Sequence, residues 1–152
     1  MKNKNIIITT LLLIVTIFSA CKKEDEMEPP SISFKTGGSY VSSSVSLPAG
    51  SALLIGIEAS KSESEGEDED VLTHFNISRS LNAGTDASVY NVDLTAAQEE
   101  DYDYDFATTV STTVGDTEKY TFTITNRDGL TGQVSLTAVS YTHLTLPTSD
   151  LV

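Results

Sequence analysis

Apolar and polar residues alternate along most of the chain between residues 52 and 138. Successive side chains of a β-strand point to opposite faces, so an alternation of period two predicts strands with one buried face. The clearest example is segment 118–126, where aromatic and aliphatic residues alternate with threonines. No segment of this region has a sustained helical period, and only residues 95–100 fit a single helical turn. We expect strands near 40–47, 52–60, 71–80, 87–94, 102–110, 118–126 and 131–138, with Ile32 and Phe34 adding an edge piece.

Turn-forming residues separate these segments at regular intervals. Pro48-Ala49-Gly50, Asn82-Ala83-Gly84 and Val114-Gly115-Asp116 each lie between two expected strands. The last two strands are joined by residues 126–129, where Gly129 can adopt the positive φ that a tight hairpin requires. Short alternating strands with regular turns are typical of an antiparallel β-sandwich, here with about seven strands. The fold class predicted is therefore all-β.

One group of residues near the end of the domain adds detail to this fold. Asp116, Tyr120 and Phe122 resemble the tyrosine corner of immunoglobulin domains, with Phe122 in place of the second cysteine. That resemblance implies that the Tyr120 hydroxyl bonds to backbone upstream of it; the alternative is an ordinary core aromatic. The whole span 32–138 resembles the small immunoglobulin-like domains of Bacteroidota-type surface lipoproteins.

The first twenty residues have the layout of an export signal. Lys2 and Lys4 provide a basic start, residues 6–18 are uncharged and mostly apolar, and Ser19-Ala20 provides small residues before a cysteine. The apolar run is shorter than the roughly 20 residues that a transmembrane helix needs. We therefore expect residues 1–20 to be a signal peptide that is removed on export.

Residues 18–21 resemble a bacterial lipobox, which implies that Cys21 carries a lipid anchor. The segment 21–31 is polar and contains Pro29-Pro30, so it is predicted to be a stiffened tether. Within it, Lys23, Glu24 and Asp25 resemble the export tag of Bacteroidota-type surface lipoproteins; the alternative is a plain solvated linker. The resemblance implies a lipoprotein anchored in the outer membrane and exposed at the cell surface.

The C-terminal segment has an unusual match. Residues 139–148, VSYTHLTLPT, resemble one reading frame of a common transposase sequencing adapter at all ten positions. We therefore expect the natural sequence to end near Ala138, with residues 139–152 derived from the adapter. The alternative is a genuine C-terminal strand, because the alternating threonines and leucines suit a sheet.

The chain is strongly acidic, with 22 Asp and Glu against 9 Lys and Arg and a net charge of −13. Such a surface repels nucleic acid, which we exclude as a partner. Cys21 is the only cysteine, so no intrachain disulfide can form and the fold must be held by packing.

The most distinctive polar group is Asp101, Asp103 and Asp105. On one strand these residues share a face, with neighbouring carboxylates roughly 7 Å apart. The spacing suggests weak Ca²⁺ binding, although the remainder of an EF-hand loop is missing, since Phe106 stands where glycine is required and Thr112 where a glutamate belongs. The alternative is a solvated face that discourages edge pairing. Residues 63–70, with six acids, are expected to form a charged loop.

These observations predict a non-catalytic, lipid-anchored module with a binding, adhesion or structural accessory role. No serine lies in a nucleophile-elbow context, and no glycine-rich phosphate loop is present. Its partner would be a protein or a glycan, and no cofactor is expected apart from the Ca²⁺ considered above. Two alternatives remain: a calcium-dependent or glycan-binding module of a nutrient-uptake system, and an N-terminal spacer domain of a longer, truncated enzyme.

Overall fold

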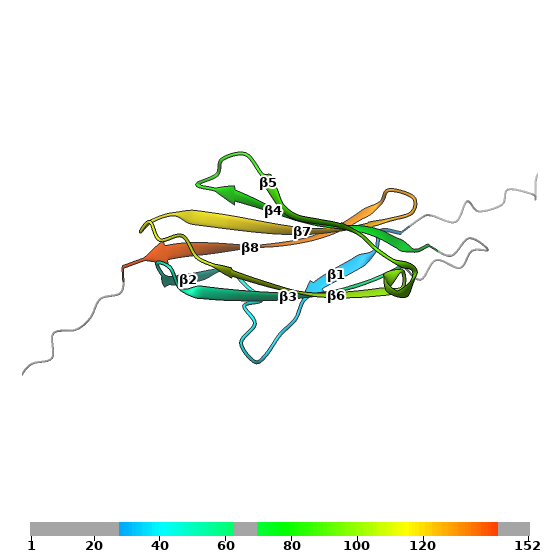
Figure 1. The fold of residues 1–152 in the computed structure, drawn as a ribbon, viewed down its shortest axis with the longest axis horizontal. Helices are drawn as coiled ribbons and strands as arrows, with labels where there is room; N and C mark the ends of the chain where they lie inside the picture. The colour runs from blue at the N-terminus through cyan, green and yellow to red at the C-terminus, as the bar shows by residue number, and fades with distance from the viewer. Residues whose placement is uncertain (1–27, 63–69, 143–152) are drawn as a thin grey trace, which may run out of the picture.

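A computed structural model of the chain describes residues 28–62 and 70–142. This part of the protein is almost entirely β-structure arranged in two sheets that pack face to face (Figure 1). The all-β class predicted from the alternating pattern is therefore confirmed, as is the two-layer arrangement.

The smaller sheet has three strands and the larger has five. The first contains β1 (Ser31–Phe34), β3 (Ala52–Ser60) and β6 (Asp101–Thr109), in the order β1-β3-β6. The second has the order β2-β8-β7-β4-β5 and is formed by β2 (Val45–Pro48), β8 (Thr131–Tyr141), β7 (Thr117–Asn126), β4 (Leu72–Leu81) and β5 (Ala87–Asp93). Strands β1 and β6 are thus the edges of the small sheet, and β2 and β5 are the edges of the large one.

Several local predictions are confirmed. The helical turn expected at 95–100 is a short 3-10 helix, η2 (Ala96–Gln98), and the hairpin between β7 and β8 has Gly129 at a φ of 80°. In the turn between β4 and β5, Asn82 and Ala83 are the residues with positive φ, and Gly84 is not. The sequence signal therefore placed this turn correctly.

The N-terminal strands differ from the expectation. The strand expected at 40–47 is shorter than predicted and corresponds to β2 (Val45–Pro48). It runs parallel to β8 in an otherwise antiparallel structure. The reason is that β1 and β2 belong to different sheets, and residues 35–44 carry the chain from one sheet to the other (Figure 1). On the way, Val41 donates a backbone hydrogen bond to Leu54 of β3 at 2.9 Å.

The last strand continues past the expected boundary at Ala138. Residues 139–141 extend β8, with Val139 opposite Thr117 of β7 and Ser140 opposite Leu47 of β2. Pairing of this kind depends on backbone groups, and the alternation of the preceding residues continues, so that Ser140 is buried like Leu136 and Ala138. The sheet therefore ends three residues later than the pattern predicted.

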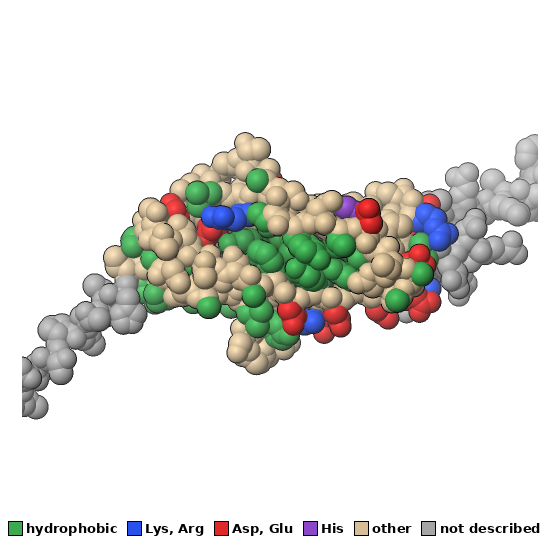
Figure 2. Space-filling view, viewed as in Figure 1, with side chains coloured by type: hydrophobic (Ala, Val, Ile, Leu, Met, Phe, Trp, Pro, Cys, Tyr) green, Lys and Arg blue, Asp and Glu red, His purple; other side chains and the backbone are tan. Residues whose placement is uncertain are grey.

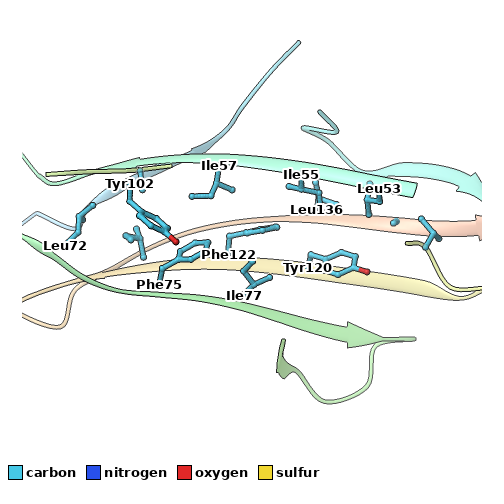
Figure 3. Packing of buried hydrophobic residues seen from close by; sticks show 14 residues of the cluster. Leu53, Ile55, Ile57, Leu72, Phe75, Ile77, Tyr102, Tyr120, Phe122 and Leu136 are labelled. Carbon is cyan, nitrogen blue, oxygen red and sulfur yellow. The ribbon is translucent and has the colours of Figure 1, made fainter. Parts of the chain in front are cut away.

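The core lies between the two sheets and consists of the inward residues of each alternating strand. Figure 3 shows Leu53, Ile55 and Ile57 of β3 facing the aromatic rings of the large sheet. Fully burying one such side chain contributes about 1.5–3 kcal/mol, and this packing must hold a fold that has no disulfide. The opposite faces of the two sheets are left for polar residues.

Candidate functional site

The outer face of the small sheet carries a regular array of polar residues. Strand alternation brings Asp101, Asp103 and Asp105 to this face, as predicted, and all three are exposed. In the register of the sheet, Ser31 and Ser60 lie beside Asp101, whereas Ser33 and Glu58 lie beside Asp103. We call this surface the acidic face; it comprises Ser31, Ser33, Glu58, Ser60, Asp101, Asp103 and Asp105.

Asp105, the third aspartate of this face, contacts a lysine and a tyrosine. Lys35 Nζ lies 3.0 Å from Asp105 Oδ1, and the Tyr40 hydroxyl donates to Asp105 Oδ2 at 2.9 Å. The Lys35 ammonium, followed by the Tyr40 hydroxyl, holds the pKa of Asp105 below its ordinary value. Gly56 allows this arrangement, because a Cβ there would lie 2.7 Å from Cδ of Lys35 and 2.8 Å from Cε1 of Tyr40.

The predicted metal ligands are therefore not equivalent. Asp105 is engaged by Lys35 and Tyr40, whereas Asp101 and Asp103 line a shallow hollow with Glu58. Among residues 28–62 and 70–142, no three carboxylate, imidazole or thiol groups are close enough together to hold a metal ion. The structure thus places the three aspartates on one face but does not assemble them into a metal centre, and calcium binding stays a prediction.

Beside β6, the opening between the two sheets is apolar. Figure 2 shows hydrophobic side chains exposed in a band between the sheets, above a margin of acidic side chains. The half-buried residues that flank this opening are Tyr90 and Val92 of β5 and Tyr104 and Phe106 of β6, which we call the apolar strip. The rings of Tyr90 and Tyr104 stack across the opening with centroids 4.5 Å apart, and burial raises the pKa of Tyr104.

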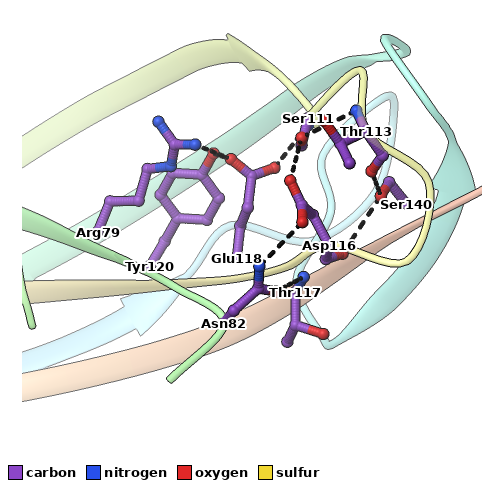
Figure 4. Close-up of polar contacts among 9 residues, drawn as sticks. All are labelled: Arg79, Asn82, Ser111, Thr113, Asp116, Thr117, Glu118, Tyr120 and Ser140. Carbon is purple, nitrogen blue, oxygen red and sulfur yellow. Dashed lines mark hydrogen bonds and ion pairs between the residues drawn. The ribbon is translucent and has the colours of Figure 1, made fainter. Parts of the chain in front are cut away.

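A buried ion pair lies at the end of the sandwich where β8 finishes (Figure 4). Glu118 is only 1% exposed, and its carboxylate lies 2.6 Å from Arg79 Nη2. It also accepts hydrogen bonds from the Ser111 N–H at 2.7 Å and from the Tyr120 hydroxyl at 3.3 Å. The expected bond from Tyr120 to upstream backbone is thus replaced by a bond to Glu118, because a carboxylate two residues away on the same face offers a charged acceptor.

A second carboxylate extends this network to the neighbouring turns. Asp116 accepts hydrogen bonds from the Ser111 hydroxyl at 2.6 Å and from Asn82 Nδ2 at 2.9 Å. The Asn82 bond, followed by the Ser111 bond, holds the pKa of Asp116 below its ordinary value. The Asp116 carbonyl oxygen also accepts from Ser140, so four separate chain segments meet here (Figure 4). This network joins the loops at this end of the sandwich to one another.

The position of two charged residues in the alternating pattern is a sequence signal for the buried pair. Arg79 follows Phe75 and Ile77 in the inward phase of β4, and Glu118 precedes Tyr120 in the inward phase of β7. Two opposite charges in the inward phase of neighbouring strands are best accommodated as partners. The exposure of the apolar strip, in contrast, depends on how far apart the edge strands β5 and β6 lie. The local sequence pattern does not determine this separation.

The remaining sequence-predicted residues lie outside the described part of the chain. Cys21, Lys23, Glu24 and Asp25 belong to this group, as do residues 63–69 of the acidic loop and residues 143–152. Within the described ranges, no helix is long and apolar enough to cross a membrane.

No protein-family model matches the chain, and no curated protein matches it.

Proposed function

We propose that this chain is a lipid-anchored module of the bacterial cell surface that binds a partner through an exposed face and has no catalytic role. The observation that carries the proposal is the acidic face, an ordered array of side chains on three paired strands. Rigid strands position such groups better than loops do, and an open acidic surface suits a macromolecular partner. The lipobox-like residues before Cys21 support the anchor.

We further propose that the sandwich is of the immunoglobulin type. Its support is the topology: β3 pairs with β6 and β4 pairs with β7, so both central pairings join strands that are distant in sequence. Such interleaved pairing, with each pair in a different sheet and a C-terminal hairpin in the larger one, is typical of the Greek-key arrangement of immunoglobulin-like sandwiches. These domains serve many roles, so this likeness supports the fold and not a particular ligand.

The two ends of the described part of the chain lie at opposite ends of the sandwich. The described chain begins with β1 at one end of the long axis, whereas β8 finishes at the other end (Figure 1). An anchor at Cys21 would therefore leave the end formed by Ser111, Asp116 and Ser140 farthest from the membrane. The acidic face, on the side of the molecule, would stay open to partners.

Lipid labelling in a lipoprotein-exporting bacterium tests the anchor. The full chain should incorporate an alkyne-tagged fatty acid and remain with the membrane fraction, whereas a Cys21→Ser variant should do neither. A variant with Lys23, Glu24 and Asp25 all replaced by alanine is the matched control, because it should keep the lipid but lose surface exposure. Unlabelled native chain would overturn the anchor, and unchanged exposure of the triple variant would overturn the tag.

A further inference from the structure

The edge strand β6 presents two distinct rows of side chains beside a free row of backbone groups. On one side are Asp101, Asp103 and Asp105, and on the other are Tyr102, Tyr104 and Phe106. In the described part of the chain, β6 pairs with β3 alone. An edge of this kind can accept another strand.

The hydrogen-bond register shows which residues face the free edge. Lys61 N–H donates to the Glu100 carbonyl, and Val110 N–H donates to the Ser51 carbonyl, both at 2.9 Å. Hydrogen-bonded and non-hydrogen-bonded pairs alternate in an antiparallel ladder, so the even-numbered residues of β6 bond to β3. The odd-numbered residues therefore direct their N–H and C=O groups outward, and these are the same residues whose side chains form the acidic row.

We infer that β6 binds an extended partner strand in which basic and apolar residues alternate. This inference rests on the proposed binding function and names the class of its partner. A partner strand that pairs with β6 would lie about 4.8 Å from it. Every second side chain of that strand would then lie beside the aspartates, and the others would lie beside the apolar strip. Lysine or arginine suits the first row, and aliphatic residues suit the second.

Charge selects a foreign partner over a second copy of the chain. Two β6 strands paired antiparallel would bring their aspartate rows opposite one another, and like charges directly opposite destabilise a pair. The net charge of −13 adds to this repulsion. A basic strand removes it, and the existing contact of Lys35 with Asp105 shows that this face already accommodates an ammonium group.

Proline substitutions separate edge pairing from other modes of binding. At Ala107, whose N–H faces outward, proline should remove an edge donor while leaving the β3 ladder and every acid in place. At Thr108, one residue further, proline should break a bond to β3 and destabilise the fold. The matched pair therefore tests both the accessibility of the edge and the register.

The binding assay uses the purified full chain and fluorescent heptapeptides in which lysine alternates with valine. We expect the lysine peptide to bind about tenfold more tightly than a glutamate–valine peptide, and Ala107→Pro to weaken it by a similar factor. If Ala107→Pro does not fold, a lysine peptide N-methylated at alternate residues gives the same test on the native chain.

Three results would overturn the inference: equal binding of the two peptides, full binding to Ala107→Pro, or full binding of the N-methylated peptide. Asp103→Asn should weaken binding in proportion to one lost charge, and added salt should weaken it further. Failure of the anchor experiment would leave this assay unaffected, since it uses purified chain. Loss of peptide binding would likewise leave lipid labelling at Cys21 unchanged, so the two failures are distinguishable.

Discussion

Arg79 Nη2 lies 2.6 Å from Oε1 of Glu118, and the two side chains are 38% and 1% exposed, respectively. Desolvation of the carboxylate is therefore nearly complete, whereas the guanidinium keeps partial contact with water. Breaking such a pair leaves one buried charge uncompensated, which costs more than the pair itself contributes.

Arg79→Met should destabilise the fold by about 2–4 kcal/mol, because the Glu118 carboxylate loses its counter-ion. Glu118→Gln should cost less, about 1–2 kcal/mol, because no buried charge remains. Its amide oxygen can still accept from the Ser111 N–H, and its amide NH2 group can donate to the Tyr120 hydroxyl. Urea unfolding measures both values. Lys119→Met, at an exposed position of β7, is the control and should stay within about 0.5 kcal/mol of the native chain. Equal effects of the three changes would show that the pair is not structural.

The acid limb of the stability profile should depend on Asp116. Its hydrogen bonds lower its pKa in the folded chain from the ordinary value of 3.8, so the unfolded chain binds the proton more readily. The stabilisation is complete above the unfolded pKa and is lost as the pH falls through the folded pKa.

We therefore expect the urea concentration at the unfolding midpoint of the native chain to decrease as the pH is lowered below about 4. In Asp116→Asn, the midpoint should change less steeply with pH in this range. Asp86→Asn makes the same charge change at an exposed position and should keep the native slope. Parallel slopes for the native chain and Asp116→Asn would contradict this assignment.

The β4–β5 turn contains a position where the natural residue is unfavourable. Ala83 has a φ of 58°, a left-handed conformation that costs a residue with a Cβ about 1–2 kcal/mol. Ala83→Gly should relieve this cost, partly offset by the greater freedom of glycine in the unfolded chain.

The expected net gain is about 0.5–1 kcal/mol, seen as a rise of a few degrees in Tm. Ala87→Gly in β5 removes a methyl group where φ is not positive, and should lower Tm instead. A decrease on Ala83→Gly would mean that the turn does not adopt this conformation.

Calcium should have little effect on the domain, because Asp105 already bonds to Lys35 and Tyr40. A site with a Kd of about 1 mM would add about 1.4 kcal/mol at about 10 mM Ca²⁺, or several degrees in Tm. We expect a shift of less than about 1 °C. A larger rise that disappears in an Asp101→Asn/Asp103→Asn variant would show instead that these aspartates bind calcium.

Much of the fold follows from local pattern, and particular residues show where that pattern is sufficient. The period-two signal of Tyr120, Phe122 and Ile124 identified β7 because one side of the strand is buried and the other is partly exposed to solvent. The three aspartates of β6 reached a common outer face for the same reason.

Long-range relations could not be predicted in this way. Lys35 meets Asp105 across 70 residues because β1 and β6 pair with the two sides of β3, and Gly56 between them leaves space for the contact. The parallel pairing of β2 with β8 is also a long-range relation, since residues 35–44 determine which sheet the chain enters. The free edge of β6 likewise follows from the sheet order, which side-chain alternation does not specify.

The most direct test of the central proposal is labelling of intact cells with a membrane-impermeant maleimide. Val114, at the end of the sandwich away from the start of β1, is 51% exposed, and Cys21 is the only native cysteine. In a full chain carrying Val114→Cys, we expect labelling of intact cells, with no labelling of the fully buried control Ile77→Cys until the chain is unfolded. Labelling of Val114→Cys only after the outer membrane has been opened would contradict display at the cell surface.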